Sequence, residues 1–166
     1  MHVKDLMSHP VVSCQSSDHL DVPARLMWEY DCGVVPVVDA EGRLTGMVTD
    51  RDVAMAAYTR GFALRQIPVG VAMAKNVLAV HPEESVESVE RLMQQGQVRR
   101  IPVIDASGRP VGLVSLNDLT LATARTHRSL EDRELVETMA AVCRPRFRRN
   151  ERLPSAAAPK VLVTAS

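Results

Sequence analysis

The chain carries an internal repeat with a period of 66 residues, and this repeat limits its possible folds more than any other feature. Residues 3–60 overlie residues 69–126 without a gap. A constant offset through Pro, Gly and Asp, whose backbone roles are specific, is not expected by chance. The repeat predicts two copies of one supersecondary unit, each too small to bury a stable core alone. The aligned pairs include Val3/Val69, Met7/Met73, Pro36/Pro102, Gly46/Gly112 and Asp52/Asp118.

Each unit has the same predicted order of strand, helix, strand, strand and helix. Short apolar runs alternate with a segment of helical period, and a turn glycine between the last two strands supplies the positive φ that a hairpin loop needs. In the first unit we expect strands near 11–14, 34–38 and 44–48, and helices from residue 20 and from Asp50. In the second we expect strands near 77–80, 100–104 and 110–114, and helices from residue 86 and from Leu116.

The sequence therefore predicts an α/β (α+β) fold of two β-α-β-β-α repeats related by a pseudo-two-fold axis. The first repeat is assigned to residues 1–62 and the second to residues 63–126, and we expect them to share one core. Residues 127–166 have no counterpart in the repeat. Ser129 precedes an apolar stripe typical of a helix that packs on the body or across a dimer, and we expect a flexible, basic tail after that helix.

Charge and cysteine content argue against a nucleic-acid-binding protein and against a secreted, disulfide-bonded protein. Twenty Lys and Arg residues balance twenty Asp and Glu residues, so the chain lacks the global positive field that nucleic-acid-binding proteins use. Three cysteines without CxxC spacing favour a reducing compartment over a disulfide framework. The N-terminus has no apolar signal-peptide core, and no apolar run approaches the ~20 residues that span a bilayer. We therefore expect a cytoplasmic protein without membrane contact.

One motif at the end of the third strand carries chemistry in both units: Gly, two apolar residues, Thr or Ser, two residues, then Asp. The hydroxyl of Thr49 or Ser115 can cap the following helix, whose N-terminal N–H groups and positive dipole also suit a phosphate. The carboxylate of Asp52 or Asp118 can accept two hydrogen bonds, as a pair of ribose hydroxyls would donate. Capping alone explains each motif structurally, but two copies at the same repeat phase favour a ligand site as well.

Three sets of aligned residues are typical of one known family. They are the opening methionines, the strands that contain Pro36 and Pro102, and the paired motifs just described. On these residues the span 3–126, about three quarters of the chain, resembles a tandem pair of cystathionine-β-synthase-type (CBS) domains. The resemblance is to small stand-alone bacterial members of that family.

The resemblance implies up to two ligand clefts, with AMP, ADP, ATP, NAD or S-adenosylmethionine as candidate ligands and no required cofactor. In such pairs the hydroxyl residue contacts phosphate and the Asp contacts ribose, which gives these roles to Thr49, Asp52, Ser115 and Asp118. The first strand and the residues before the proline line the cleft. The remaining candidate ligand-binding residues are Val11, Val12, Val34, Val35, Arg51, Val77, Leu78, Arg99, Arg100 and Ile101.

The two clefts are not expected to be equivalent. The second repeat places Arg99 and Arg100 beside its cleft, and guanidinium groups suit bidentate contact with phosphate. The first repeat has Gly33 and Val34 at the same positions. Its cleft would therefore depend on Arg51 or on residues from across the axis.

The predicted function is that of a regulatory module that senses an adenosyl ligand and signals to a separate, unknown effector protein. No nucleophile or acid–base pair suggests an enzyme, and no histidine spacing suggests a metal site. The resemblance implies a homodimer, and we expect Trp28 and Tyr30 at a dimer surface rather than stacked on a base. Three alternatives stay open: a dimerisation module without ligand, a metal bridged across a dimer, and nucleic-acid binding through the basic segment 144–152.

Overall fold

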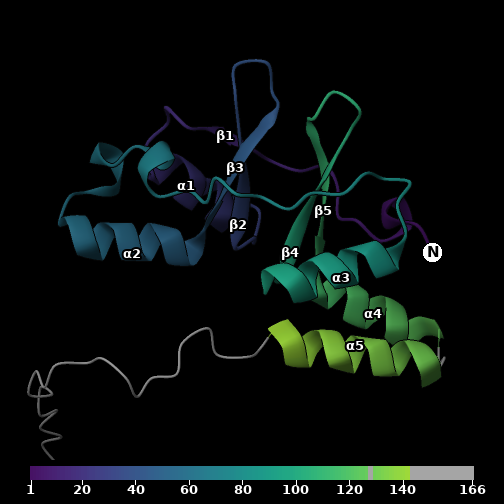
Figure 1. Ribbon diagram of the computed structural model, residues 1–166. Coiled ribbons are helices and arrows are strands. Elements are labelled where there is room, and N and C mark those ends of the chain that lie inside the picture. The colour runs from purple at the N-terminus through teal and green to yellow at the C-terminus, as the bar shows by residue number, and fades with distance from the viewer. Residues whose placement is uncertain (127–128, 143–166) are drawn as a thin grey trace, which may run out of the picture.

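The computed structural model describes residues 1–126 and 129–142 and has a mixed α/β architecture (Figure 1). The first repeat contains β1 (Cys14–Gln15), α1 (Asp21–Glu29), β2 (Val34–Val38), β3 (Leu44–Thr49) and α2 (Asp50–Arg60). The second contains α3 (Val86–Gly96), β4 (Arg100–Ile104), β5 (Pro110–Ser115) and α4 (Leu116–Thr126), and α5 (Ser129–Val142) follows. Short 3₁₀ helices lie at Val3–Asp5, Leu64–Gln66 and Val69–Val71. The predicted fold class is confirmed, whereas the basic segment 144–152 and the rest of the expected tail lie outside the described residues.

Two antiparallel hairpins form the centre of the fold. β2 pairs with β3 and β4 pairs with β5 in the same register, so that Val34 lies opposite Thr49 and Arg100 lies opposite Ser115. All five residues of β2 are buried, as its unbroken run of apolar residues predicts for a strand covered on both faces. The turn glycines of the hairpins have φ angles of 82° and 78°, the left-handed conformation expected of them.

The first predicted strand of each unit is much shorter than expected. β1 keeps only Cys14–Gln15, parallel to β2, and the second unit has a single parallel bridge between Val80 and Val103. Val11 and Val12 precede β1 outside the sheet and are half-buried. An apolar pattern over so few residues does not separate a strand from an extended segment that packs on a neighbour.

A pseudo-two-fold axis relates the repeats, and the opening segment of each repeat crosses over to the other repeat. Ser8 pairs with Leu113, and the equivalent residues 66 positions away, Ala74 and Met47, pair in the same way. The opening segment of each repeat therefore lies beside the third strand of the other.

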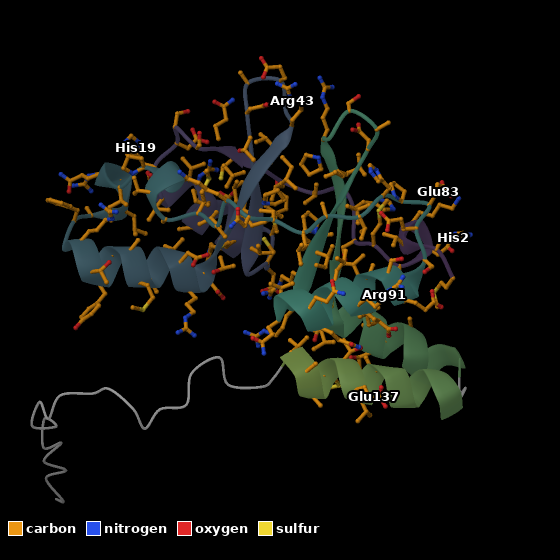
Figure 2. All side chains as sticks on the ribbon, in the orientation of Figure 1. His2, His19, Arg43, Glu83, Arg91 and Glu137 are labelled. Atoms are coloured by element: carbon orange, nitrogen blue, oxygen red, sulfur yellow. The ribbon has the colours of Figure 1, made fainter. Side chains whose placement is uncertain are left out.

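The exchange extends into the cores. At the N-terminus, Nδ1 of His2 lies 2.9 Å from the carbonyl oxygen of Glu83. Figure 2 shows the two residues side by side. Val3 follows and is fully buried in the core of the second repeat. Conversely, Ile67 and Val69, at the start of the second repeat, are buried in the core of the first. Each core is completed by residues of the other repeat, so the two repeats form one interlocked body.

Close packing explains why the repeats share a glycine in the third strand and a methionine in the opening segment. A Cβ atom on Gly46 would lie 2.8 Å from Sδ of Met73, and one on Gly112 would collide with the side chain of Met7. The glycine therefore leaves room for the methionine of the exchanged segment.

The C-terminal helix expected from the sequence is present and covers the second repeat. Figure 1 shows α5 below α3 and α4, on the side away from the hairpin turns. Leu135 and Val142 of α5 belong to the second core, and the amide of Gln94 in α3 donates a hydrogen bond of 2.9 Å to the hydroxyl of the buried Thr138. Within the described ranges, no helix combines the length and the apolar character needed to cross a membrane.

Candidate ligand-binding cleft

Ser115 and Asp118 form a reciprocal cap where β5 passes into α4. The backbone N–H and the hydroxyl of Ser115 both donate to Oδ2 of Asp118, at 2.7 Å and 2.6 Å. The backbone N–H of Asp118 donates in turn to the hydroxyl of Ser115 at 3.3 Å. The cap occupies one carboxylate oxygen, and within the described residues no hydrogen bond reaches the other, Oδ1. The helix terminus therefore keeps one free anionic acceptor.

Thr49 and Asp52 form the same cap where β3 passes into α2. The backbone N–H and hydroxyl of Thr49 donate to Oδ2 of Asp52 at 2.9 Å and 2.7 Å, and the N–H of Asp52 donates back at 3.2 Å. The geometry of both caps is that of the capping box predicted from the repeated motif. The hydrogen bonds of the cap are therefore the same in both motifs and do not indicate which of the two binds a ligand.

A cleft of about 590 Å³ opens at the Ser115 cap and lies between the two repeats. It is lined by the opening segment of the first repeat, the loop between α1 and β2, and the β5–α4 junction. Seven of the sequence-predicted ligand-binding residues line it: Val11, Val12, Val34, Arg99, Arg100, Ser115 and Asp118.

The other seven predicted residues do not line this cleft. Val35 and Ile101 are fully buried in the two cores. The remaining five belong to the pseudo-symmetric position on the other side of the axis: Thr49, Arg51, Asp52, Val77 and Leu78.

The pseudo-symmetric position differs in packing. A Cβ atom on Gly96 would lie only 2.6 Å from Cδ1 of Leu78, so this leucine packs directly onto the backbone there. At the open cleft, the residues equivalent to Gly96 and Leu78 are Tyr30 and Val12, and both line the cavity. Leu78 thus fills space beside Gly96.

Two arginines of the second repeat, Arg99 and Arg100, place positive charge at the open cleft. Neither Arg99 nor Arg100 forms an ion pair within the part of the chain that the structure describes. Gly33 lets Arg100 approach the first repeat, because a Cβ atom there would lie 3.1 Å from Nη2 of Arg100 and 3.0 Å from Oδ2 of Asp50. The two guanidinium groups and the N-terminus of α4 make this end of the cleft suitable for an anion.

The cleft also offers acceptors and apolar surface. Asp31 and Asp118 line it, as do the apolar residues Val11, Val12 and Val34. Such a lining suits a ligand that combines an anionic group, hydroxyl donors and a flat apolar ring.

Several lining residues were not among the sequence-predicted site residues. They come from the loop after α1, where Asp31 has a positive φ of 48°, from β5 and the start of α4, and from the exchanged opening segment. The 66-residue offset gave no sign that the opening segment crosses to the other repeat. The unpredicted lining residues are Ser8, Pro10, Tyr30, Asp31, Cys32, Gly33, Leu113, Leu116 and Asn117.

The described cysteines have different surroundings. Cys14 lies in the first core, where burial raises the pKa of its thiol to about 12. Cys32 is half-buried and lines the cleft. Among the described residues, no cluster of three or more His, Cys, Asp and Glu side chains could hold a metal ion.

Two bacterial relatives match most of the chain in sequence. The chain is 36% identical over 119 residues to the CBS domain-containing protein YhcV of Bacillus subtilis, which covers 72% of this chain and 83% of YhcV. It is 29% identical over 142 residues to hypoxic response protein 1 of Mycobacterium tuberculosis, which covers 86% of this chain and 94% of that protein.

Solved structures with the same fold contain different ligands. The CBS domain pair of protein MJ0100, in complex with 5′-methylthioadenosine and S-adenosyl-L-methionine, has a TM-score of 0.69 at 26% identity and covers 75% of this chain and 97% of its own. Hypoxic response protein I, with two coordinated zinc ions, has a TM-score of 0.66 at 29% identity over 73% of this chain and 98% of its own.

The family model for the CBS domain matches residues 3–58 and again residues 64–125. These two ranges coincide with the two interlocked repeats described above. The chain therefore belongs to the CBS-domain family, as a tandem pair of CBS domains.

Proposed function

We propose that this protein is a regulatory ligand-sensing module that binds an adenine nucleotide or a related adenosyl ligand in the cleft at Ser115 and Asp118. The observation that carries the proposal is the free Oδ1 atom of Asp118, placed in one cleft with two arginines that lack ion pairs among the described residues. The cleft volume of about 590 Å³ falls within the ~300–1,000 Å³ that is usual for small-molecule sites.

Each part of such a ligand finds a suitable group. Oδ1 of Asp118 would accept hydrogen bonds from ribose hydroxyls, while Oδ2 continues to hold the cap. The phosphate would lie at the N-terminus of α4, within reach of Arg99 or Arg100. Val11 and Val12 would contact the base.

The relatives support this ligand class. The MJ0100 pair contains 5′-methylthioadenosine and S-adenosyl-L-methionine, both of which carry an adenosyl group. The candidates for this chain are AMP, ADP, ATP, NAD and S-adenosylmethionine.

The position of the cleft between the repeats supports a sensing role rather than catalysis. A ligand that contacts both repeats stabilises one packing of the pair relative to others, and a separate effector protein could read that shift in population. The family match covers two CBS domains, whose role in this chain we propose to be regulatory.

The test is a titration of these five compounds into the full chain, with Asp118→Asn and Asp52→Asn as a matched pair. Asparagine keeps an oxygen that can hold the cap, so both variants should fold, but only Asp118→Asn removes a charge that lines the open cleft. We expect Asp118→Asn to weaken binding at least about tenfold and Asp52→Asn to leave it nearly unchanged.

Equal affinity in both variants would exclude the ribose role of Asp118. No binding of any of the five compounds to the wild-type chain would favour the second candidate, a dimerisation module without ligand. The packing of Leu78 onto Gly96 is the observation that favours this candidate at the Thr49 side.

A further inference from the structure

The side chain of Arg100 reaches from the second repeat to the first. Arg100 is the first residue of β4 and lies opposite Ser115 in the second hairpin. Its Nη2 atom lies 3.1 Å from the position that a Cβ atom on Gly33 of the first repeat would take. Arg100 is half-buried and also lines the open cleft. One guanidinium group therefore connects the cleft with the start of β2.

An acidic side chain lies at the same point. Oδ2 of Asp50 is 3.0 Å from the same Cβ position on Gly33. Oδ2 of Asp50 and Nη2 of Arg100 are therefore at most about 6 Å apart, within the ~4–6 Å over which opposite charges affect each other. Asp50 is the first residue of α2, is exposed, and is not among the residues that line the cleft. Arg100 thus has a negative neighbour outside the cleft that it lines.

The carboxylate of Asp50 is fixed through one oxygen and leaves the other available. The backbone N–H of Asp50 donates to the carbonyl oxygen of Gly33 at 3.3 Å. The backbone N–H of Arg51 donates to Oδ1 of Asp50 at 2.7 Å. Within the described residues, no hydrogen bond or ion pair reaches Oδ2. The available oxygen of Asp50 is therefore the one that lies near Arg100.

Arg100 is attracted to Asp50 without being fixed by it. No ion pair joins the two side chains in residues 1–126 and 129–142. A partly exposed pair of opposite charges changes an equilibrium by at most about fivefold. A phosphate at the Ser115 cap would accept charge-assisted, bidentate hydrogen bonds from the same guanidinium, which are stronger. Arg100 can therefore exchange Asp50 for a bound anion.

The pseudo-symmetric copy of this arrangement carries no charge. The residue 66 positions after Asp50 is Leu116. The residue 66 positions before Arg100 is Val34, and both of these apolar residues are buried. The backbone contact is nevertheless kept, because the N–H of Leu116 donates to the carbonyl oxygen of Arg99 at 2.9 Å. The fold therefore forms this junction without an acidic and a basic side chain, and the pair in the first copy is available for another role.

We propose that Arg100 is shared between Asp50 and the phosphate of a bound ligand, so that Asp50 competes with the ligand for this guanidinium group. The proposal rests on the proposed function and adds a regulatory step to it. A phosphate at the Ser115 cap draws Arg100 towards the cleft and leaves the carboxylate of Asp50 without its cationic neighbour. Occupancy of the cleft is thereby transmitted to the start of α2, which lies outside it.

Such sharing restricts the class of ligand that produces the change. Adenosine can donate its ribose hydroxyls to Asp118 but offers no anion to Arg100. AMP differs from adenosine by its phosphate and therefore has an additional interaction with one position of Arg100. A ligand shifts a conformational equilibrium only by its difference in affinity for the two states. An adenosyl ligand with a phosphate thus changes the start of α2, whereas one without an anionic group binds without this effect.

The test is a double-mutant cycle of Asp50→Asn and Arg100→Gln in the full chain. The titrants are AMP, adenosine and inorganic pyrophosphate. Asparagine keeps the oxygen that accepts from Arg51, so the start of α2 should stay intact. Asp50→Asn should tighten the binding of AMP and pyrophosphate about two- to fivefold, because Arg100 loses its competing partner, and should leave adenosine binding unchanged. Arg100→Gln alone should weaken AMP binding about tenfold.

The second half of the cycle separates sharing from a general effect of charge. In the Arg100→Gln background, Asp50→Asn should leave the affinity for AMP and pyrophosphate unchanged, whereas simple repulsion between Asp50 and the anion would persist. Asp21→Asn is the matched control. Asp21 is the first residue of α1, is exposed and does not line the cleft, so its substitution should leave all three affinities unchanged.

The backbone amide of Arg51 gives a second readout, because it donates to Asp50. In NMR spectra, saturating AMP should shift this amide resonance in the wild type and leave it in place in Arg100→Gln. Adenosine should shift it in neither protein. An amide that moves equally with AMP in both proteins would contradict transmission through Arg100.

The outcomes distinguish this proposal from the proposed function. If AMP binds but Asp50→Asn has no effect, or an equal effect in both backgrounds, the sharing of Arg100 is excluded and the ligand site stands. If neither AMP nor adenosine binds but pyrophosphate follows the cycle, the adenosyl site is excluded and the sharing of Arg100 stands. A wild-type chain that binds neither AMP nor pyrophosphate would overturn both.

Discussion

Asp118 shows how one side chain can serve both the fold and a ligand. Its Oδ2 atom holds the start of α4, and its Oδ1 atom is left for other partners. Asp52 has the same bonds but does not line the open cleft. The sequence motif predicted both caps correctly because capping depends on residues three positions apart. Whether the second carboxylate oxygen meets a cavity depends on packing from the other repeat, which the motif does not encode.

The shared glycines provide a prediction about stability. A Cβ atom on Gly46 would lie 2.9 Å from the carbonyl oxygen of Ala74, which is fixed by a hydrogen bond from Met47. A Cβ atom on Gly112 would meet side-chain atoms of Met7 and no backbone atom; Sδ and Cγ can rotate away, whereas Cβ, 3.2 Å distant, is held by the backbone. Gly46→Ala should therefore lower the free energy of unfolding by about 2 kcal/mol and Gly112→Ala by about 1 kcal/mol. Urea denaturation measures both, and an equal or larger loss for Gly112→Ala would contradict this account of the packing.

The cysteines provide a prediction about reactivity. With a pKa of about 12, only about one in 10⁴ Cys14 thiols is ionised at pH 8. Iodoacetamide should therefore modify Cys32 and spare Cys14, and a bound adenine nucleotide should slow the modification of Cys32 because that residue lines the cleft. Peptide mass spectrometry measures both rates, and a Cys143→Ser background removes the thiol outside the described residues. Unchanged modification of Cys32 at saturating ligand would contradict occupancy of this cleft.

The raised pKa of Cys14 predicts that the stability of the fold decreases at alkaline pH. In the folded protein the pKa of the Cys14 thiol is about 12, whereas its ordinary value is 9.0. Its contribution to stability is present below about pH 9 and is lost as the pH rises from there towards 12.

At the scale of elements, local patterns predicted what local interactions decide. β2 and β4 have the predicted bounds, and α2 and α4 begin at Asp50 and Leu116 as expected, because apolar runs, turn glycines and caps are all read within a few residues. The first strands were wrong in length, since their partners lie more than 20 residues away. The docking of α5 depends on the surface of α3 and α4, so periodicity predicted a helix but not the repeat that it covers.

The integration of α5 into the second core can be tested directly. Leu135 is only 7% exposed and belongs to the core that also contains Val142 and residues of α3 and α4. Leu135→Ala should lower the free energy of unfolding by about 2–4 kcal/mol, as removal of a buried leucine does. The control Val71→Ala, at an exposed position, should stay within about 0.5 kcal/mol of the wild type. A loss for Leu135→Ala as small as that of the control would mean that α5 is not part of the cooperative core.

At the scale of the whole molecule, the exchanged opening segments make the two repeats dependent on each other. Val3 completes the second core and Val69 completes the first, although each belongs in sequence to the other repeat. The repeat alone predicted two similar units that share one core, and the structure contains two cores tied together by crossing segments. Unfolding either repeat would expose apolar surface in the other, so we expect one cooperative transition.

A ligand should move that single transition as a whole, because both repeats line the cleft. At about 100 times its dissociation constant, an adenine nucleotide bound only by the native state adds about 2.7 kcal/mol. For a chain of this size, this raises Tm by roughly 5–10 °C. Scanning calorimetry at a fixed protein concentration should find one peak before and after addition, and Val69→Ala should lower that peak without splitting it. Two peaks, of which the ligand moves only one, would show that the crossing segments do not couple the repeats, and the cleft could then not report its occupancy through the packing of the pair.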